Sequence, residues 1–137
     1  VTAKGGNLLL GVGPTPEGII QPEVAGILKE IGNWLKINGQ SIYNTRITPI
    51  YQSKSIWFTA DKNKKNLYAI YVPSNGDSIS DFIEWEGNIP IKGSKVIELQ
   101  NGKSVKWVQS GNKTRIYPGS SSLKSGNILT FSFQIAK

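Results

Sequence analysis

The sequence predicts a mainly β protein: an antiparallel β-sandwich preceded by one β-strand and one α-helix of the kind that build a (β/α)8-type barrel. Two observations lead to this fold class. Apolar residues recur at helical spacing between residues 22 and 38, and after Tyr43 the pattern changes to alternation interrupted by Gly, Asn and Ser. We therefore expect an incomplete terminal β/α unit over residues 1–45 and a C-terminal β-sandwich domain over residues 46–137.

The first expected element is a strand over residues 7–12, an apolar run with three consecutive leucines bounded by glycines. Such a run is typical of a strand that is buried on both faces, as in a parallel sheet. Because a parallel strand is stable only when it is paired and covered, we expect it to pack onto the sandwich together with the helix that follows, or to contact another chain.

The second expected element is a helix that begins after Gln21. Pro22 suits the first helical turn, and the carboxylate of Glu23 suits the positive end of the helix dipole. Gly39 predicts a helix end of the left-handed kind. One face of the helix carries an apolar stripe for a core, made of Val24, Ile27, Leu28, Ile31 and Leu35 with Trp34 beside it.

The remaining elements are short strands separated by turns. Asn101-Gly102 is the strongest indication of a hairpin, and the last strand places Leu129, Phe131 and Phe133 on one face. Such short antiparallel strands suit a β-sandwich. We expect them over residues 55–59, 66–72, 78–85, 89–91, 95–99, 104–108, 113–117 and 127–136.

The composition excludes several classes of function within this chain. The 137 residues include no Cys and no His, which excludes thiol catalysis, Ser-His-Asp catalysis and zinc sites built on those side chains. No apolar run approaches the ~20 residues that span a bilayer, so we expect no membrane partner. The net charge of +7 raises the question of nucleic acid, but the lysines are scattered over turns and strand edges, so we expect no nucleic-acid partner.

Short motifs in the first third of the chain follow one another in a specific order: Gly6-Asn7-Leu8-Leu9-Leu10, Gly13-Pro14, Gly18, Ile31-Gly32, Trp34-Leu35, Asn38-Gly39 and Ile42-Tyr43. With these motifs the sequence resembles the C-terminal end of α-L-fucosidases, retaining glycoside hydrolases whose barrel is followed by a β-sandwich. The last hairpins of that family are resembled by residues 96–99, Gly102, Val105, Trp107 and residues 116–118. The resemblance covers nearly the whole chain.

The resemblance implies a parent enzyme that hydrolyses α-linked L-fucose with retention, through an Asp nucleophile and a separate carboxylic acid, without metal or cofactor. It places both carboxylates upstream of Val1, so we expect no catalytic residue in this chain and no activity of the chain alone. The implied partners are the rest of the catalytic barrel and, through the parent enzyme, a fucosylated glycan. The resemblance also implies a secreted, periplasmic or lysosomal parent.

The candidate substrate-binding residues lie in the loop that follows the expected barrel strand, because loops after barrel strands form the catalytic face. We expect Gly11, Gly13, Thr15 and Glu17 to form part of the pocket rim. A solvated loop acid is the alternative for Glu17. The loop is not a phosphate-binding loop, because it lacks the Lys-Ser/Thr pair of that motif.

Two other groups of residues have an ordinary structural explanation. Glu84 and Glu86 flank Trp85 on a predicted strand, where they would share one face as exposed acids while the tryptophan enters the core. The large aromatic residues of the sandwich could stack on sugars, but a core position is favoured for them. They are Trp57, Tyr68, Tyr71, Trp85 and Trp107.

The alternative function is a stand-alone carbohydrate-binding β-sandwich whose exposed aromatic residues stack on glycans. The expected strand and helix of the first third count against it, because such a module needs no barrel unit. A basic module for anionic polymers is a third possibility, which the scattered lysines disfavour.

Overall fold

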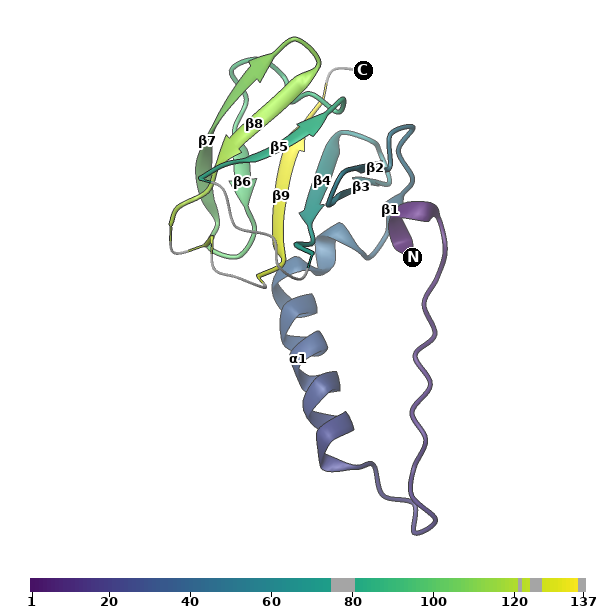
Figure 1. Cartoon of the computed structure of the whole chain (residues 1–137). Helices are drawn as coiled ribbons and strands as arrows, with labels where there is room; N and C mark the ends of the chain where they lie inside the picture. Colours follow the sequence, from purple (N-terminus) through teal and green to yellow (C-terminus); the bar gives the residue numbers. More distant parts are fainter. Residues whose placement is uncertain (75–80, 121, 124–126, 136–137) are drawn as a thin grey trace.

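The computed structural model describes residues 1–74, 81–120, 122–123 and 127–135, and within them nine strands form a β-sandwich beside one long helix (Figure 1). The mainly β fold class predicted from the sequence is confirmed. The strands are β1 (Thr45–Arg46), β2 (Gln52–Ser53), β3 (Ile56–Asp61), β4 (Asn66–Tyr71), β5 (Ile83–Glu86), β6 (Val96–Glu98), β7 (Lys103–Ser110), β8 (Lys113–Tyr117) and β9 (Leu129–Gln134).

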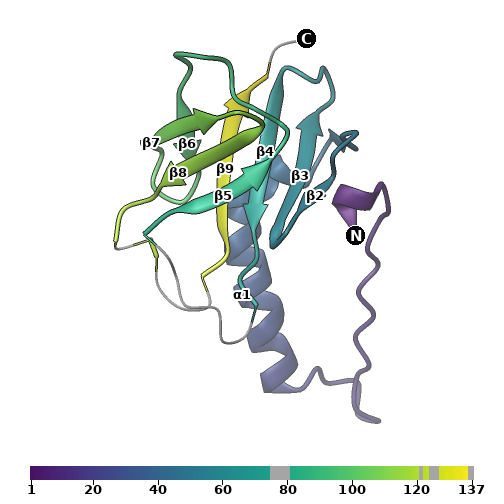
Figure 2. The same cartoon turned by 45° about the horizontal axis from the view of Figure 1, so that its top comes forward.

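Strand β7 joins the two layers of the sandwich. The strands follow the order β1-β3-β4-β9-β6-β7-β8-β5, with β2 paired to β3, and all neighbours are antiparallel. The first part of β7 pairs with β6, where Val105 lies opposite Val96, and the second part pairs with β8, where Trp107 lies opposite Ile116. As a result, β5, β7 and β8 form a layer that crosses over β9 and β4 (Figure 2).

The core lies between these layers and is centred on Trp85 of β5. Its ring is fully buried, meets Phe58 of β3 edge-on at 5.9 Å between centroids, and stacks on Phe133 of β9 at 5.6 Å. Such offset and edge-on contacts are the preferred arrangements of aromatic rings. The predicted inward face of the last strand is confirmed, because Leu129, Phe131 and Phe133 all belong to this core.

The outer face of β3 is covered as well, by the short 3-10 helices η1 (Thr2–Lys4) and η2 (Gly39–Ser41). Ala3 of η1 is buried, and the Thr59 hydroxyl of β3 donates a hydrogen bond of 2.7 Å to the carbonyl of Ser41. Strand β3 is therefore buried on both faces, which explains why its middle residues show no alternation of burial.

The long helix α1 (Pro22–Asn38) has Gln21 as its N-cap residue, as predicted. The predicted left-handed end at Gly39 is wrong: Gly39 keeps a right-handed conformation with φ of −57°, and the chain continues into η2. A side chain at Gly39 would meet the ring of Tyr43 at 2.9 Å. The glycine is thus explained by close approach of an aromatic ring.

The strand predicted over residues 7–12 does not form. The segment is extended, but it pairs with no strand of the described chain, and Leu9 is 96% exposed (Figure 1). The expectation that this segment packs onto the sandwich together with the helix is wrong, because no neighbouring strand is present to bond its backbone groups. Its contact with another chain stays a prediction.

Smaller differences concern the ends of the predicted strands. Residues 89–91 supply only an isolated bridge, between Pro90 and Ile135, in place of a strand. Strands β1 and β2 were not predicted, because two residues are too few to show alternation. Residues 78–80 and Ala136, at the ends of two predicted strands, lie outside the described residues.

Candidate functional site

The predicted rim loop forms an exposed turn at the far end of the N-terminal segment (Figure 1). The amide of Gly18 donates to the carbonyl of Thr15, and the amide of Thr15 donates to the carbonyl of Ile19, both at 2.8 Å. The Thr15 hydroxyl oxygen also accepts a hydrogen bond of 3.3 Å from the amide of Ile19. Gly18 has φ of +80°, a conformation that favours glycine. This turn reverses the chain just before α1.

The four candidate rim residues therefore lie on one loop. Gly11, Gly13 and Glu17 are exposed, and Thr15 is half-buried and supports the turn. Added Cβ atoms at Gly11 and Gly13 would meet nothing within 4 Å. The arrangement leaves the carboxylate of Glu17 accessible to a ligand.

Apolar side chains on both sides of this loop are exposed, and we call Leu8, Leu9, Leu10, Ile27 and Ile31 the N-terminal apolar set. Their exposed fractions are 70%, 96%, 53%, 58% and 41%. Ile27 and Ile31 belong to the stripe for which the sequence predicts a core. Leu8, Leu9 and Leu10 are consecutive and expose a run of apolar surface, and exposed apolar patches mark interaction sites.

The C-terminal half of α1 approaches the outer face of the sheet but leaves an apolar cavity of about 380 Å³ open beside it. Its wall includes Ile31 and Trp34 of the helix and Ile70, Val72 and Ile128 of the sandwich. The helix stripe is therefore only partly covered within this chain.

Glu84 and Glu86 lie on the outer face of β5, opposite the inward Trp85, as predicted, but only Glu86 is exposed: the expectation of an exposed acid is wrong for Glu84, which is half-buried among cations. Arg115 of β8 donates to Glu84 at 2.8 Å, and these hydrogen bonds hold the pKa of the Glu84 carboxyl below its ordinary value. Lys113 lies 3.7 Å from Glu84 and 3.6 Å from Glu86. Paired with cations, these acids serve structure, because a general acid needs a raised pKa.

The cationic side chains around Glu84 could not be predicted from the sequence. Arg115 follows Glu84 by 31 positions, and only the pairing of β5 with β8 brings the two together. Lys54, from the turn before β3, also lies 3.8 Å from Glu84. The alternation of β5 and β8 indicates which residues face outward, but it does not identify cross-strand partners.

The large aromatic residues of the sandwich divide between core and surface. Trp85 and Tyr68 are buried, and burial raises the pKa of the Tyr68 hydroxyl. Trp57, Tyr71 and Trp107 are half-buried. Core packing therefore explains Trp85 and Tyr68 by burial, and Tyr71 and Trp107 pack partly against the core, whereas Trp57 stacks on Tyr51 instead.

Within the described residues, no group of His, Cys, Asp and Glu side chains is placed to hold a metal ion. No helix among the same residues is long and apolar enough to cross a membrane.

Comparison with known proteins relates both parts of this chain to one family. The sequence model described as alpha-L-fucosidase matches residues 1–40. The plasma alpha-L-fucosidase of Pongo abelii is 38% identical over 112 residues, which cover 76% of this chain and 23% of the relative. The alpha-L-fucosidase of Dictyostelium discoideum is 34% identical over 105 residues, which cover 71% and 23%. The chain thus spans less than a quarter of these relatives.

Solved structures agree with the sequence comparison. An alpha-L-fucosidase from Bacteroides thetaiotaomicron, trapped as a covalent intermediate, superposes with a TM-score of 0.79 at 19% identity over 98% of this chain and 30% of its own. The alpha-fucosidase of Thermotoga maritima in complex with fucose gives 0.75 at 25% identity, over 96% and 31%. The first of these supports the fold, and the second supports the fold and the relationship.

Proposed function

Because the chain belongs to the α-L-fucosidase family and its fold matches the C-terminal β-sandwich of that family, we propose that it is the C-terminal part of an enzyme that releases α-linked L-fucose with retention. Residues 1–45 act as the terminal β/α unit of the catalytic barrel in this proposal. Residues 46–137 form a sandwich that buttresses the barrel.

The N-terminal apolar set is the observation that carries this proposal. The N-terminal segment that carries Leu8, Leu9 and Leu10 is extended, and its backbone groups pair with no strand of the described part of the chain. A barrel strand that lacks its neighbouring strands would have this conformation. Ile27 and Ile31 on α1 are exposed in the same region. A barrel that pairs with the segment and covers the helix would bury all five side chains at once.

The loop between these elements forms part of the pocket rim in this proposal. Loops after barrel strands surround the substrate, and the turn held by Thr15 and Gly18 carries Glu17 at an exposed position. Glu17 would accept hydrogen bonds from sugar hydroxyls, and the glycines at 11 and 13 would let the backbone approach the sugar. The glycan partner and the rim role both rest on this placement.

Catalysis itself requires groups from outside this chain. Retaining glycosidases use two carboxyl groups about 5–5.5 Å apart, and the paired acids of β5 are neutralised by Arg115 and Lys113. The chain alone is therefore inactive in this proposal, and the fucosylated glycan is bound through the parent enzyme.

The test compares hydrolysis of an aryl α-L-fucoside by the 137-residue chain and by the longer protein that the proposal requires. Activity is expected only in the longer protein, and proton NMR is expected to detect α-L-fucose as the first product, which reports retention. Activity in neither sample would contradict the proposed function. The β anomer as first product would contradict retention alone.

A further inference from the structure

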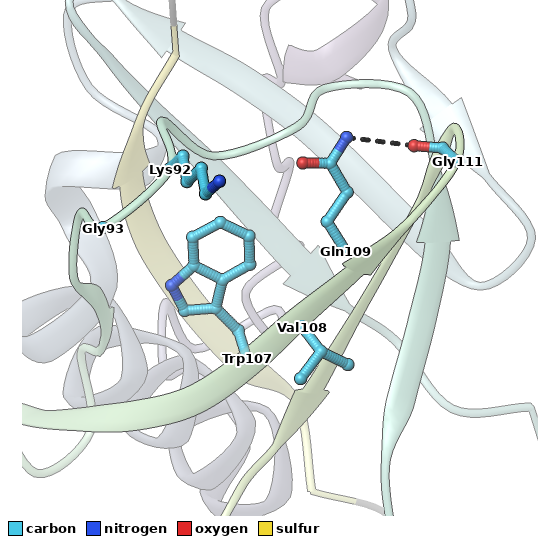
Figure 3. A pocket seen from close by; sticks show the side chains of 6 residues that line it. All are labelled: Lys92, Gly93, Trp107, Val108, Gln109 and Gly111. Atoms are coloured by element: carbon cyan, nitrogen blue, oxygen red, sulfur yellow. Dashed lines mark hydrogen bonds between the residues drawn. The ribbon is translucent and has the colours of Figure 1, made fainter.

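We propose that Trp107 forms the floor of a second sugar-binding site, on the sandwich, which holds one neutral pyranose ring of a glycan. The site is a cavity of about 600 Å³ between β7 and the loop that follows β5 (Figure 3). Its wall consists of Lys92, Gly93, Trp107, Val108, Gln109 and Gly111. None of residues 1–45 takes part, so the proposal does not depend on the fucosidase activity.

The indole of Trp107 is fixed before any ligand arrives. Its Nε1 donates a hydrogen bond of 2.9 Å to the carbonyl of Ser94, and part of the ring packs against the core. The ring is half-buried, and its remaining surface faces the cavity. A fixed aromatic plane binds the apolar face of a pyranose with little loss of conformational entropy.

Two polar side chains border the indole. The Gln109 amide nitrogen donates a hydrogen bond of 3.0 Å to the carbonyl of Gly111, which holds the amide so that its oxygen lies on the side of Trp107 (Figure 3). That oxygen is an acceptor. Lys92, from the opposite loop, lies near the indole edge in Figure 3 and offers a donor. A donor and an acceptor beside an aromatic floor suit a ligand whose hydroxyl groups both accept and donate.

The charge of the cavity favours a neutral sugar over a nucleotide. Lys92 is the one cationic side chain in its wall, and no ion pair of Lys92 occurs among the described residues. Phosphate recognition uses bidentate arginine or several donors together, which this wall does not provide. A pocket with mostly apolar lining and a few polar groups is the usual form of a small-molecule site.

The site differs in position from the predicted rim. Trp107 belongs to β7, in the layer of the sandwich remote from α1, whereas residues 11–18 lie beyond the other end of the helix (Figure 1). A glycan bound at Trp107 would therefore hold the protein to its substrate polymer or surface without occupying the pocket.

The experiment uses the ¹⁵N-labelled 137-residue chain and the indole N–H resonances of its four tryptophans. Trp107→Phe identifies the resonance of Trp107. Methyl β-D-galactoside, N-acetyl-D-glucosamine and L-fucose are titrated separately, with adenosine monophosphate as a competitor of another class. At least one sugar is expected to shift the Trp107 resonance saturably with a millimolar Kd.

Variants of exposed residues separate this site from binding elsewhere. Gln109→Ala and Lys92→Ala each remove one hydrogen bond to the sugar and are expected to weaken binding about fivefold. Lys106→Ala, next to Trp107 on the other face of β7, is the matched control and is expected to leave the Kd unchanged.

Three results would overturn the proposal. They are no saturable shift of the Trp107 resonance with any of the three sugars, affinities in the Gln109 and Lys92 variants equal to that of the unsubstituted chain, and binding of adenosine monophosphate alone. Far-UV circular dichroism of each variant checks that the fold is retained. Retention of the fold is expected because Lys92 and Gln109 are both exposed.

Discussion

Arg115 on β8 donates two hydrogen bonds, from Nε at 3.2 Å and from Nη2 at 2.8 Å, to the same carboxylate oxygen of Glu84 on β5. The guanidinium also lies 4.1 Å from the centre of the Phe82 ring, so one side chain contacts both the acid and an aromatic face. The Glu84 side chain is only 16% exposed. The Arg115–Glu84 pair therefore links β5 to β8 on the outer face of the sheet through their side chains.

Glu84→Gln is expected to lower stability near neutral pH and to flatten its decline in acid. The hydrogen bonds from Arg115 lower the pKa of Glu84 in the folded state. A lowered folded pKa gives stability that is present above the ordinary pKa of glutamate and is lost as pH falls through the lowered value. Urea midpoints measured across this acid range check the expectation. Glu86→Gln is the control, because Glu86 is 56% exposed and should change little. If the stability of the Glu84→Gln variant declined in acid as steeply as that of the starting protein, the expectation would be contradicted.

Trp85→Ala is expected to lower the free energy of unfolding by about 3–5 kcal/mol. The ring is fully buried and contacts aromatic residues of both β3 and β9, so its removal leaves a cavity between the layers. Urea unfolding followed by circular dichroism measures the change. Lys103→Ala, at an exposed position of β7, should stay within about 0.5 kcal/mol of the starting protein. A similarly small effect at Trp85 would contradict the described core.

Gly26→Ala and Gly39→Ala are expected to act in opposite directions. Gly26 lies inside α1 with nothing near its Cβ position, so alanine should raise helix stability by about 0.5–1 kcal/mol. At Gly39 the added methyl meets the Tyr43 ring, and such overpacking costs about 1–3 kcal/mol. Thermal unfolding by circular dichroism compares the two. Tyr43→Ala should rescue Gly39→Ala, and a failure of rescue would assign the cost to another contact.

Leu9→Ala is expected to have different effects in two contexts. In the 137-residue chain, where Leu9 is almost fully exposed, the free energy of unfolding should change by less than about 0.5 kcal/mol. In the longer protein the proposed barrel buries Leu9, and the cost should be about 2–5 kcal/mol. Val108→Ala, 41% exposed on β7, should be small in both. Equal, small effects of Leu9→Ala in both proteins would argue against a barrel strand here.

Glu17→Gln in the longer protein tests the rim. Loss of the charge weakens hydrogen bonds to sugar hydroxyls, so KM is expected to rise about three- to tenfold while kcat changes less. Steady-state kinetics on an aryl α-L-fucoside provide both values. Glu23→Gln, in the first turn of α1, serves as the control. Unchanged kinetics at Glu17 would leave it as a solvated loop acid.

The sequence allowed much of the sandwich to be predicted, because alternation identifies the face of a strand that enters the core. In the last strand Phe131 and Phe133 point inward as expected, but Thr130 on the opposite face is buried as well, which alternation did not indicate. The apolar run over residues 7–12 was predicted less well. The apolar run indicates a strand that is stable only beside another strand. The sequence of the run does not show whether such a strand is present, so the prediction failed in this chain.

Of the two candidate sites, one could be predicted from the sequence and the other could not. Residues 11–18 were recognised as a loop from their glycines, and their turn is local. The cavity at Trp107 was not predicted, because it arises where β7 leaves β6 for β8 and the loop carrying Lys92 closes over the gap. Contacts between distant segments leave no periodic trace in a sequence.

The shared strand β7 also determines how the sandwich comes apart. Its single backbone takes part in both layers, through Val105 on one side and Trp107 on the other. Releasing β7 would remove a hydrogen-bonded neighbour from β6 in one layer and from β8 in the other. Amide protons of β6 and β8 should therefore become exchangeable with solvent in one common opening event, as members of a single cooperative unit.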